Sequence, residues 1–194
     1  MRIDNLETYG WDSAIRGMRN PMLSHDRIDS KGENIGENDA DLMKRLIKAG
    51  SSHRKFLRQI MVSMDITACL KFWDEFATYE FTVCNSTSQM HSMGKQLLGE
   101  EHFSSIDPTI LQVVNAKITK WQEDRSEANF RDMIDSIPQS FLYTRTVTTN
   151  YEVVMNMIMS RRNHKMKEWR TLCLVLMAAL PNIDWMLDSK EDDK

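Results

Sequence analysis

The sequence predicts a single α+β domain, in which a few strands combine with several helices. Segments 56–68 and 78–84 alternate apolar or β-branched residues with polar ones, which is the pattern of strands. Segment 110–124 has apolar residues at helical spacing, which is the pattern of an amphipathic helix. With 194 residues, of which 41% are hydrophobic and 27% charged, the chain has the composition of a soluble globular protein with one substantial core.

The first half of the chain is expected to mix strands and helices. Asn20-Pro21 marks the end of the first helix, because the residue before a proline disfavours helical geometry. Gly50 marks the end of the second, because glycine is favoured just past a helix C-terminus. In order, we expect a strand over 1–9, a helix over 11–18, a polar loop over 24–38, a helix from Asp39 or Asp41 to about Ala49, a strand over 56–68, a helix over 69–76 and a strand over 78–84.

The second half is expected to be mainly helical. Asp107 and Pro108 form a good helix start, with an acceptor side chain at the cap and proline at the first helical position. The last residues are polar, so we expect one domain over 1–188 and a frayed polar tail over 189–194. The expected elements are helices over 110–124 and 126–134, an extended segment over 137–147, a helix that begins at Thr148–Thr149, and a helix over 166–180.

Charge and composition exclude several classes of function. The net charge of −3 provides no basic surface for duplex nucleic acid. No apolar run approaches the length of a membrane span and no signal peptide is recognisable, so we expect a cytoplasmic protein without a membrane partner. The sequence has no phosphate-binding glycine loop or nucleophile elbow, and no catalytic residue is assigned. We expect reduced cysteines and no metal site, because no metal-ligand spacing links Cys69, Cys84, Cys173, His25, His53, His91, His102 and His164.

One candidate site lies on the helix expected after Thr148. Asn150 and Arg161 would lie within about 20° of one helix face and roughly 16 Å apart along the axis. An amide and a guanidinium in this arrangement would be able to hold the two ends of a long ligand that carries a phosphate. The alternative is an amphipathic helix on which both are surface or capping residues.

Paired arginines and a run of hydroxyls form two further candidates. Arg16 and Arg19 are one helical turn apart beside a helix end, where two guanidiniums would bind a phosphate or carboxylate. The alternative is a solvated pair of surface charges. Segment 85–88 (NSTS) contains Ser86 and Ser88 and follows a strand, where hydroxyls meet the polar edge of a ligand. The alternative there is a turn stabilised by its own side chains.

Segment 137–161 carries a spaced set of residues that occurs in a known family. The set comprises Ile137-Pro138, Tyr143-Thr144, Thr148-Thr149-Asn150, Asn156 and Ser160-Arg161. It resembles the C-terminal segment of the flavin-dependent thymidylate synthases, the ThyX family, which has a Leu-Pro turn, a Tyr-Thr pair, a Thr-x-Asn, a second Asn and a Leu-Arg. The spacing from Pro138 to the other positions fits without net insertion, and the Tyr-Thr pair is displaced by one residue.

Two elements outside this segment extend the resemblance. His53 in SSHRKF matches a family histidine that lies next to the flavin. Asn85 and Ser88 match the Asn and the last Ser of the family's Ser-x-Asn-Glu-x-Ser element, whereas Ser86 replaces its Glu. The Arg-His-Arg that precedes this element in the family is absent, and Met90 stands where a further Arg is expected.

The resemblance implies a ThyX-like fold, in which a central twisted and largely antiparallel sheet is flanked by helices. Family members methylate dUMP to dTMP, with methylenetetrahydrofolate as the carbon source and NADPH as the reductant of FAD. They form homotetramers with the flavin at subunit interfaces, so we expect a dimer or tetramer here. The implied contacts are His53, Asn150 and Asn156 for FAD, and Ser86, Ser88 and Arg161 for a nucleotide such as dUMP.

The missing arginines leave two classes of function open. In the family they help to bind phosphates and activate the uracil ring, and losing a charged hydrogen bond costs about 1.5–3 kcal/mol. Replacement charge would have to come from Arg16, Arg19, Arg54 or Arg58. The alternative class is a noncatalytic nucleotide-binding or interaction protein that keeps the fold and has lost the reaction. Within the enzyme class, a related flavin enzyme that acts on another nucleotide is also open.

Overall fold

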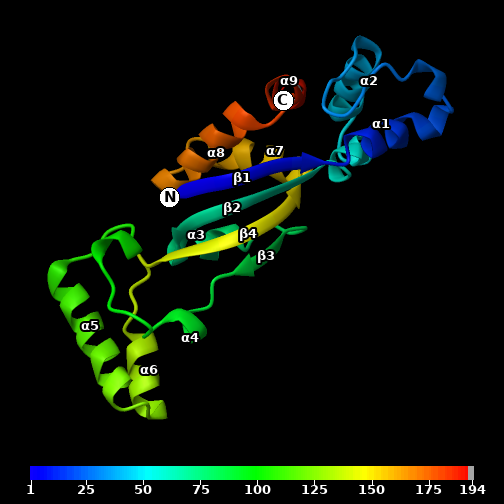
Figure 1. Cartoon of the computed structure of the whole chain (residues 1–194). Coiled ribbons are helices and arrows are strands. Elements are labelled where there is room, and N and C mark those ends of the chain that lie inside the picture. The colour runs from blue at the N-terminus through cyan, green and yellow to red at the C-terminus, as the bar shows by residue number, and fades with distance from the viewer. Residues whose placement is uncertain (192–194) are drawn as a thin grey trace. The chain divides into compact units, whose positions relative to one another are not determined.

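The computed structural model describes residues 1–191 of the chain (Figure 1). These residues form a four-stranded antiparallel sheet with the strand order β1-β2-β4-β3. The predicted α+β class, with a largely antiparallel sheet and helices, is confirmed. The strands are β1 (Arg2–Tyr9), β2 (Met61–Cys69), β3 (Val83–Ser86) and β4 (Leu142–Asn150).

The chain forms two compact units, and the sheet contributes residues to both. The first unit consists of residues 1–2, 65–78 and 84–146. The second unit consists of residues 3–64, 79–83 and the chain from Val147 onward. Strands β2 and β4 each begin in one unit and end in the other.

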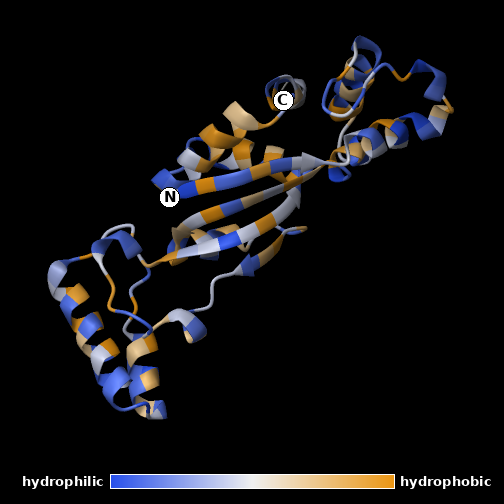
Figure 2. Ribbon diagram, in the orientation of Figure 1, coloured by the Kyte–Doolittle hydropathy of each residue, from blue (hydrophilic) through white to orange (hydrophobic). Residues whose placement is uncertain are grey.

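The first unit contains α3 (Leu70–Phe76), α4 (Gln89–Ser92), the 3₁₀ helix η4 (Glu100–His102), α5 (Pro108–Glu123) and α6 (Glu127–Asp135). Helix α5 begins as predicted, because the side chain of Asp107 accepts a hydrogen bond from the backbone N–H of Thr109 at 2.7 Å. Apolar and hydrophilic residues alternate around α5 and α6 (Figure 2). Their apolar faces contribute to a core of Met93, Leu98, Phe103, Val114, Ile118 and Met133.

The second unit contains α1 (Trp11–Arg19), α2 (Glu37–Lys48), α7 (Tyr151–Arg161), α8 (Lys167–Ala179), α9 (Ile183–Glu191) and the 3₁₀ helices η1 (Asn20–Met22), η2 (His25–Arg27) and η3 (Arg54–Arg58). Tyr151 ties several of these elements together. Its ring meets that of Trp11 edge to face, with centroids 5.0 Å apart. Its backbone N–H donates to the carbonyl of Ile60 at 3.0 Å, and its hydroxyl to that of Pro181 at 2.8 Å.

Two of the predicted strands begin later than expected. The strand expected over 56–68 begins at Met61, after η3. Phe56 and Leu57 are adjacent and both buried, which the alternating faces of a half-exposed strand do not allow. The strand expected over 78–84 is β3, which begins at Val83. Phe81 has a φ of 59°, in the left-handed region that extended strands exclude.

Two helix starts also differ from the prediction. The helix expected from Thr148–Thr149 begins at Tyr151, because these β-branched residues continue β4 instead. Neither Asp39 nor Asp41 caps α2. The N-cap is Gly36, and Asp39 lies inside the helix with its side chain buried.

The end of the described chain is helical. Residues 189–191 of the expected polar tail belong to α9, and residues 192–194 lie outside the described residues. Within residues 1–191, no single helix is both long and apolar enough to cross a membrane. Helices α8 and α9 would meet that requirement only together, and a bend of 108° separates them. The same residues contain no group of three His, Cys, Asp or Glu side chains placed to hold a metal ion.

Candidate functional site

Two hollows in the second unit share the segment 51–59 as a wall. The larger has a volume of about 750 Å³ and the smaller about 320 Å³. Most of this segment is the 3₁₀ helix η3, in which neighbouring residues point in different directions around the axis. The larger hollow is therefore lined by Ser52, His53, Lys55, Phe56 and Gln59, and the smaller by Ser51, Arg54 and Arg58.

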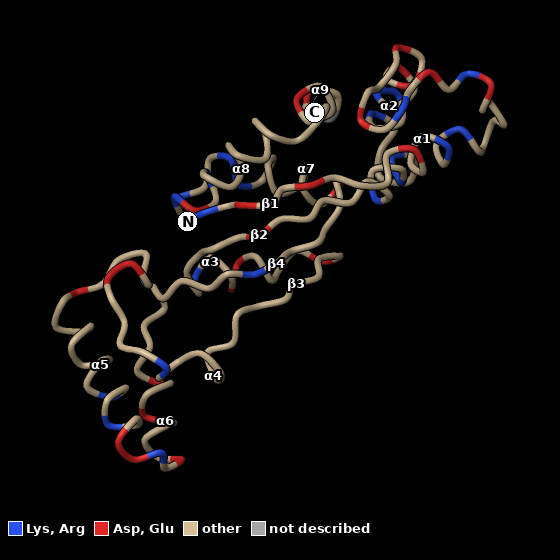
Figure 3. The backbone as a smooth tube through the Cα atoms, in the orientation of Figure 1, with Lys and Arg blue, Asp and Glu red and all other residues tan. Residues whose placement is uncertain are grey.

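The larger hollow combines positive charge with apolar surface. Arg27, Arg45 and Lys55 contribute cations, and Asp26 is the single acidic residue among the described residues of its lining. Basic residues are visible on α1 and α2 in Figure 3. Arg45 forms an ion pair with Asp41 at 3.0 Å, but both side chains are about two-thirds exposed, so this pair holds the guanidinium only weakly. The apolar lining comes from Met18, Met22, Leu23, Leu42, Leu46 and Phe56.

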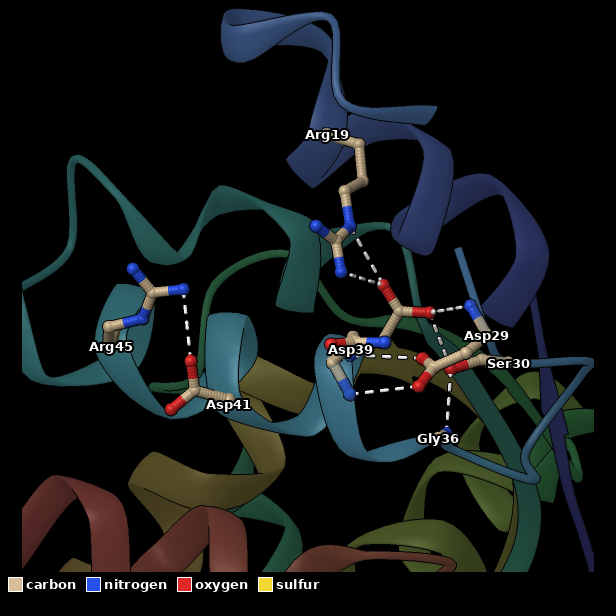
Figure 4. Close-up of polar contacts among 8 residues, drawn as sticks. Arg19, Asp29, Ser30, Gly36, Asp39, Asp41 and Arg45 are labelled. Carbon is tan, nitrogen blue, oxygen red and sulfur yellow. Dashed lines mark hydrogen bonds and ion pairs between the residues drawn. The ribbon is translucent and has the colours of Figure 1, made fainter. Parts of the chain in front are cut away.

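Arg19 also lines the larger hollow, but a buried ion pair holds its charge. Its Nε and Nη2 donate to Oδ1 of Asp39 at 2.9 and 2.7 Å, and both side chains are buried. The other carboxylate oxygen of Asp39 accepts bonds from the backbone N–H of Asp29 and the hydroxyl of Ser30 (Figure 4). Arg19, which was expected to bind a phosphate or carboxylate of a ligand, therefore has its charge matched within the chain by Asp39.

The same network fixes the polar loop before α2. The carboxylate of Asp29 accepts hydrogen bonds from the backbone N–H groups of Asn38 and Asp39, at 2.9 and 3.1 Å. The bond from Asn38 is the main cause that lowers the pKa of Asp29. The N–H of Gly36 donates to the hydroxyl of Ser30 at 2.9 Å (Figure 4). This part of the loop is therefore anchored to the first turn of α2.

Asn150 and Asn156, which were both predicted to contact a flavin, line the smaller hollow. Asn150 is the N-cap of α7, where its side-chain oxygen accepts a hydrogen bond from the N–H of Val153 at 3.2 Å. Asn150 thus precedes the helix that Arg161 ends, so the two do not form the predicted pair on one helix face. The capping role is the alternative that the sequence left open.

Glu152 faces two arginines at the smaller hollow. Its carboxylate accepts a hydrogen bond from Nε of Arg54 at 3.0 Å and another from Nε of Arg58. Burial by itself raises the pKa of Glu152, but these two hydrogen bonds and the positive charges outweigh it, so the pKa is lowered. Arg54 and Arg58, two of the four arginines that were expected to supply replacement charge, are therefore paired with Glu152.

We expect Glu152→Gln to lower the free energy of unfolding at neutral pH by about 1–3 kcal/mol, because it leaves the guanidinium groups of Arg54 and Arg58 with a neutral and poorer acceptor. The pKa of Glu152 is lowered on folding, so the wild-type advantage is complete above the ordinary glutamate pKa of about 4.3. It is lost as the pH falls through the lower folded value. Urea denaturation of both proteins from pH 7 to pH 3 measures this. A difference that stays constant over the range would contradict the assigned role.

Arg161 lies at the end of α7 among aromatic side chains of the second unit. Its Nε donates to the hydroxyl of Tyr79 at 3.0 Å, and its Nη1 lies 3.0 Å from Nε2 of His164. The guanidinium carbon is 4.9 Å from the ring centroid of Trp169 and 5.8 Å from that of Tyr79. These contacts fix the orientation of Arg161, and it lines neither of the two hollows.

The remaining predicted residues are distributed over both units. Arg16 is exposed in the second unit, where its Nη2 donates to the hydroxyl of Ser13 at 3.2 Å. Ser86 is the last residue of β3, and Ser88 precedes α4, so both belong to the first unit. The structure therefore brings Asn150 and Asn156 into one hollow and His53 into its neighbour. It shows no such grouping for Arg16 and Arg161.

The comparisons with known proteins concern the fold. No protein-family model matches the chain, and no curated protein matches it by sequence. Two crystal structures of ThyX from Helicobacter pylori, both with FAD and dUMP, are similar to it at 16% identity. One has a TM-score of 0.77 and a match that covers 99% of both chains. The other has a TM-score of 0.75, with 98% of this chain and 100% of that chain covered.

The fold of this chain is therefore the fold of two structures that were solved with a flavin and a nucleotide bound. In particular, the chain has the fold of the flavin-dependent thymidylate synthase ThyX, as the spaced residues of segment 137–161 predict.

Proposed function

We propose that this chain is a flavin-dependent thymidylate synthase-like protein, which binds FAD and methylates dUMP to dTMP with methylenetetrahydrofolate and NADPH. The observation that carries the proposal is the pair of hollows along segment 51–59. They are lined by the three residues matched to flavin contacts, His53, Asn150 and Asn156. They occur in a fold whose solved examples contain FAD and dUMP.

The chemistry of the larger hollow fits FAD. A pyrophosphate requires cationic donors, which Arg27, Arg45 and Lys55 supply, and an aromatic ring system requires apolar surface, which Met18 and Phe56 supply. When bound, the flavin would supply the hydride chemistry, and the protein would supply binding and orientation. In this proposal His53 contacts the cofactor from the larger hollow and the two asparagines from the smaller one.

The proposal extends to the nucleotide and to the assembly. Ser86, Ser88 and Arg161 are the proposed contacts of dUMP, since these positions match nucleotide contacts of the family. Arg16 is a proposed additional cation, because it is exposed and lies one turn from the residues that line the larger hollow. The protein would act in the cytoplasm as a homodimer or homotetramer.

A second function, noncatalytic nucleotide binding, is favoured by the segment where the family carries Arg-His-Arg. This segment, 71–81, consists mainly of α3, whose Phe72, Trp73 and Phe76 are buried in the core. Its aromatic residues stabilise the fold and offer no cation to a phosphate. A protein that binds FAD and dUMP but forms no dTMP with methylenetetrahydrofolate and NADPH would have this second function.

The proposal is tested by titration of FAD, followed by flavin absorbance and calorimetry. We expect wild-type protein to bind FAD and Asn156→Ala to bind it about tenfold more weakly, roughly 1.4 kcal/mol. Asn163→Ala is the matched control, because Asn163 is also an exposed asparagine and lines neither hollow. Wild-type protein that binds no FAD would refute the proposal, and equal loss in both variants would refute the assigned position.

A further inference from the structure

Arg145 is a cation of the first unit that the sequence patterns do not single out. It lies on β4, and its guanidinium carbon is 4.5 Å from the ring centroid of Trp73. Its Nε is buried and has no hydrogen-bond partner among the described residues. Arg145 forms no ion pair within residues 1–191 either, so its charge is stacked on an aromatic ring and otherwise unmatched in that part of the chain.

An unmatched buried donor on a permanent charge is unusual. Guanidinium carries five N–H donors, and a buried donor without an acceptor costs about 1–3 kcal/mol, more on a charged group. Stacking on Trp73 covers one face of the guanidinium plane and leaves its edge for hydrogen bonds. An anionic ligand with two oxygens would satisfy that edge, as carboxylates and phosphates do.

The sheet register places a hydroxyl beside Arg145. The backbone N–H of Thr87 donates to the carbonyl of Thr144 at 2.9 Å, and β3 and β4 are antiparallel neighbours. One step further along each strand, Ser86 lies opposite Arg145, and directly opposite residues point to the same face. Cys84 lies two residues before Ser86, so it shares that face. Burial raises the pKa of Cys84 and the charge of Arg145 opposes this, as expected for neighbours.

Three of the four arginines considered earlier as replacement charge are less suitable. Arg19 is paired with Asp39, and Arg54 and Arg58 are paired with Glu152. Recruiting any of them to a ligand would leave a buried carboxylate without its partner, which is costly. Recruiting Arg145 breaks no ion pair.

We propose that Arg145 and the hydroxyl of Ser86 form a binding site for the phosphate monoester of a nucleotide. This assignment rests on the proposed function, because it takes the nucleotide of that reaction as the ligand. Arg145 then provides charge that the family obtains from its Arg-His-Arg, and it does so from β4 instead of the segment before β3. Ser86, which stands in place of a family Glu, also removes a negative charge that would repel the phosphate.

The test compares dUMP with deoxyuridine, which lacks the phosphate, by calorimetric titration of wild type, Arg145→Gln and Arg131→Gln. We expect wild type to bind dUMP at least tenfold more tightly than deoxyuridine, and Arg145→Gln to lose most of that preference. Arg131→Gln is the control of equal charge change, because Arg131 is exposed on α6 and paired with Asp135. It should keep the preference. Ser86→Ala, at an exposed position, gives a smaller loss and covers the case in which Arg145→Gln fails to fold.

The inference is overturned if wild type shows no preference for dUMP over deoxyuridine. It is also overturned if Arg145→Gln keeps the full preference. If Arg145→Gln does not fold, a folded Ser86→Ala variant that keeps the full preference overturns it. Inorganic phosphate that binds as tightly as dUMP would also overturn it, since the site would then belong to the free anion. FAD titration of the same proteins separates this inference from the proposed function. A phosphate preference that depends on Arg145 in a protein that binds no FAD would support the site and refute the flavin proposal.

Discussion

Asp39→Ala is expected to lower the free energy of unfolding by about 3–5 kcal/mol, which is typical when one partner of a buried ion pair is removed. The substitution leaves the guanidinium of Arg19 buried without its acceptor. It also removes the acceptor of the N–H of Asp29 and the hydroxyl of Ser30, which anchor the loop before α2. Urea denaturation followed by tryptophan fluorescence measures the loss.

Asp41→Ala is the matched control on the same helix. Asp41 pairs with Arg45 at the surface, where both side chains are about two-thirds exposed, so the loss should stay below about 1 kcal/mol. Similar unfolding midpoints for the two variants would show that the buried network contributes no more than a surface pair. The double variant Arg19→Leu with Asp39→Leu should recover part of the loss, because it leaves no unpaired charge.

Gly10→Ala is expected to lower the free energy of unfolding by about 2–5 kcal/mol, the sum of a conformational cost and a steric cost. Gly10 has a φ of 84°, and a left-handed conformation costs other residues about 1–2 kcal/mol. A Cβ at this position would also lie 2.2 Å from the backbone oxygen of Gln59, and relieving such overpacking costs typically about 1–3 kcal/mol. Thermal unfolding followed by circular dichroism measures the combined effect.

Gly50→Ala separates the two causes. Gly50 has a φ of 94°, but a Cβ there would meet no atom within 4 Å. We therefore expect it to show the conformational cost alone, about 1–2 kcal/mol. If Gly10→Ala were no more destabilising than Gly50→Ala, the predicted steric cost against the backbone of Gln59 would be wrong.

The elements predicted well from the sequence are those whose signals are local. Asp107 and Pro108 set the start of α5 through the next residues of the chain, and Gly50 follows the end of α2 as a glycine is expected to. The start of α7 depends on residues far away as well as on local ones. Thr149 continues β4 because its hydroxyl meets Thr82 and the carbonyl of Phe81, partners that no local pattern reveals.

The candidate site divides in the same way. The resemblance of segment 137–161 to the ThyX family was enough to propose Asn150 and Asn156, and both line one hollow. The partner of Arg19 lies 20 residues away, and Glu152 is 98 residues from Arg54. An ion pair formed across such a separation leaves no periodic signal, so the sequence could not show which arginines were already engaged. Arg145 was missed for the converse reason, since nothing local marks a cation whose partner is absent.

Because the segment that includes η3 is a wall of both hollows, a change in its conformation would alter both of them together. A ligand in the larger hollow meets His53 and Lys55, while the adjacent Arg54 belongs to the smaller one. If occupancy on one side shifts the equilibrium between conformations of this segment, affinity on the other side changes by a definite factor. Linkage requires the reverse effect to have the same size. If one cofactor spanned both hollows, contacts of either half with this segment would strengthen the binding of the other half, because both halves would stabilise the same conformation of the segment.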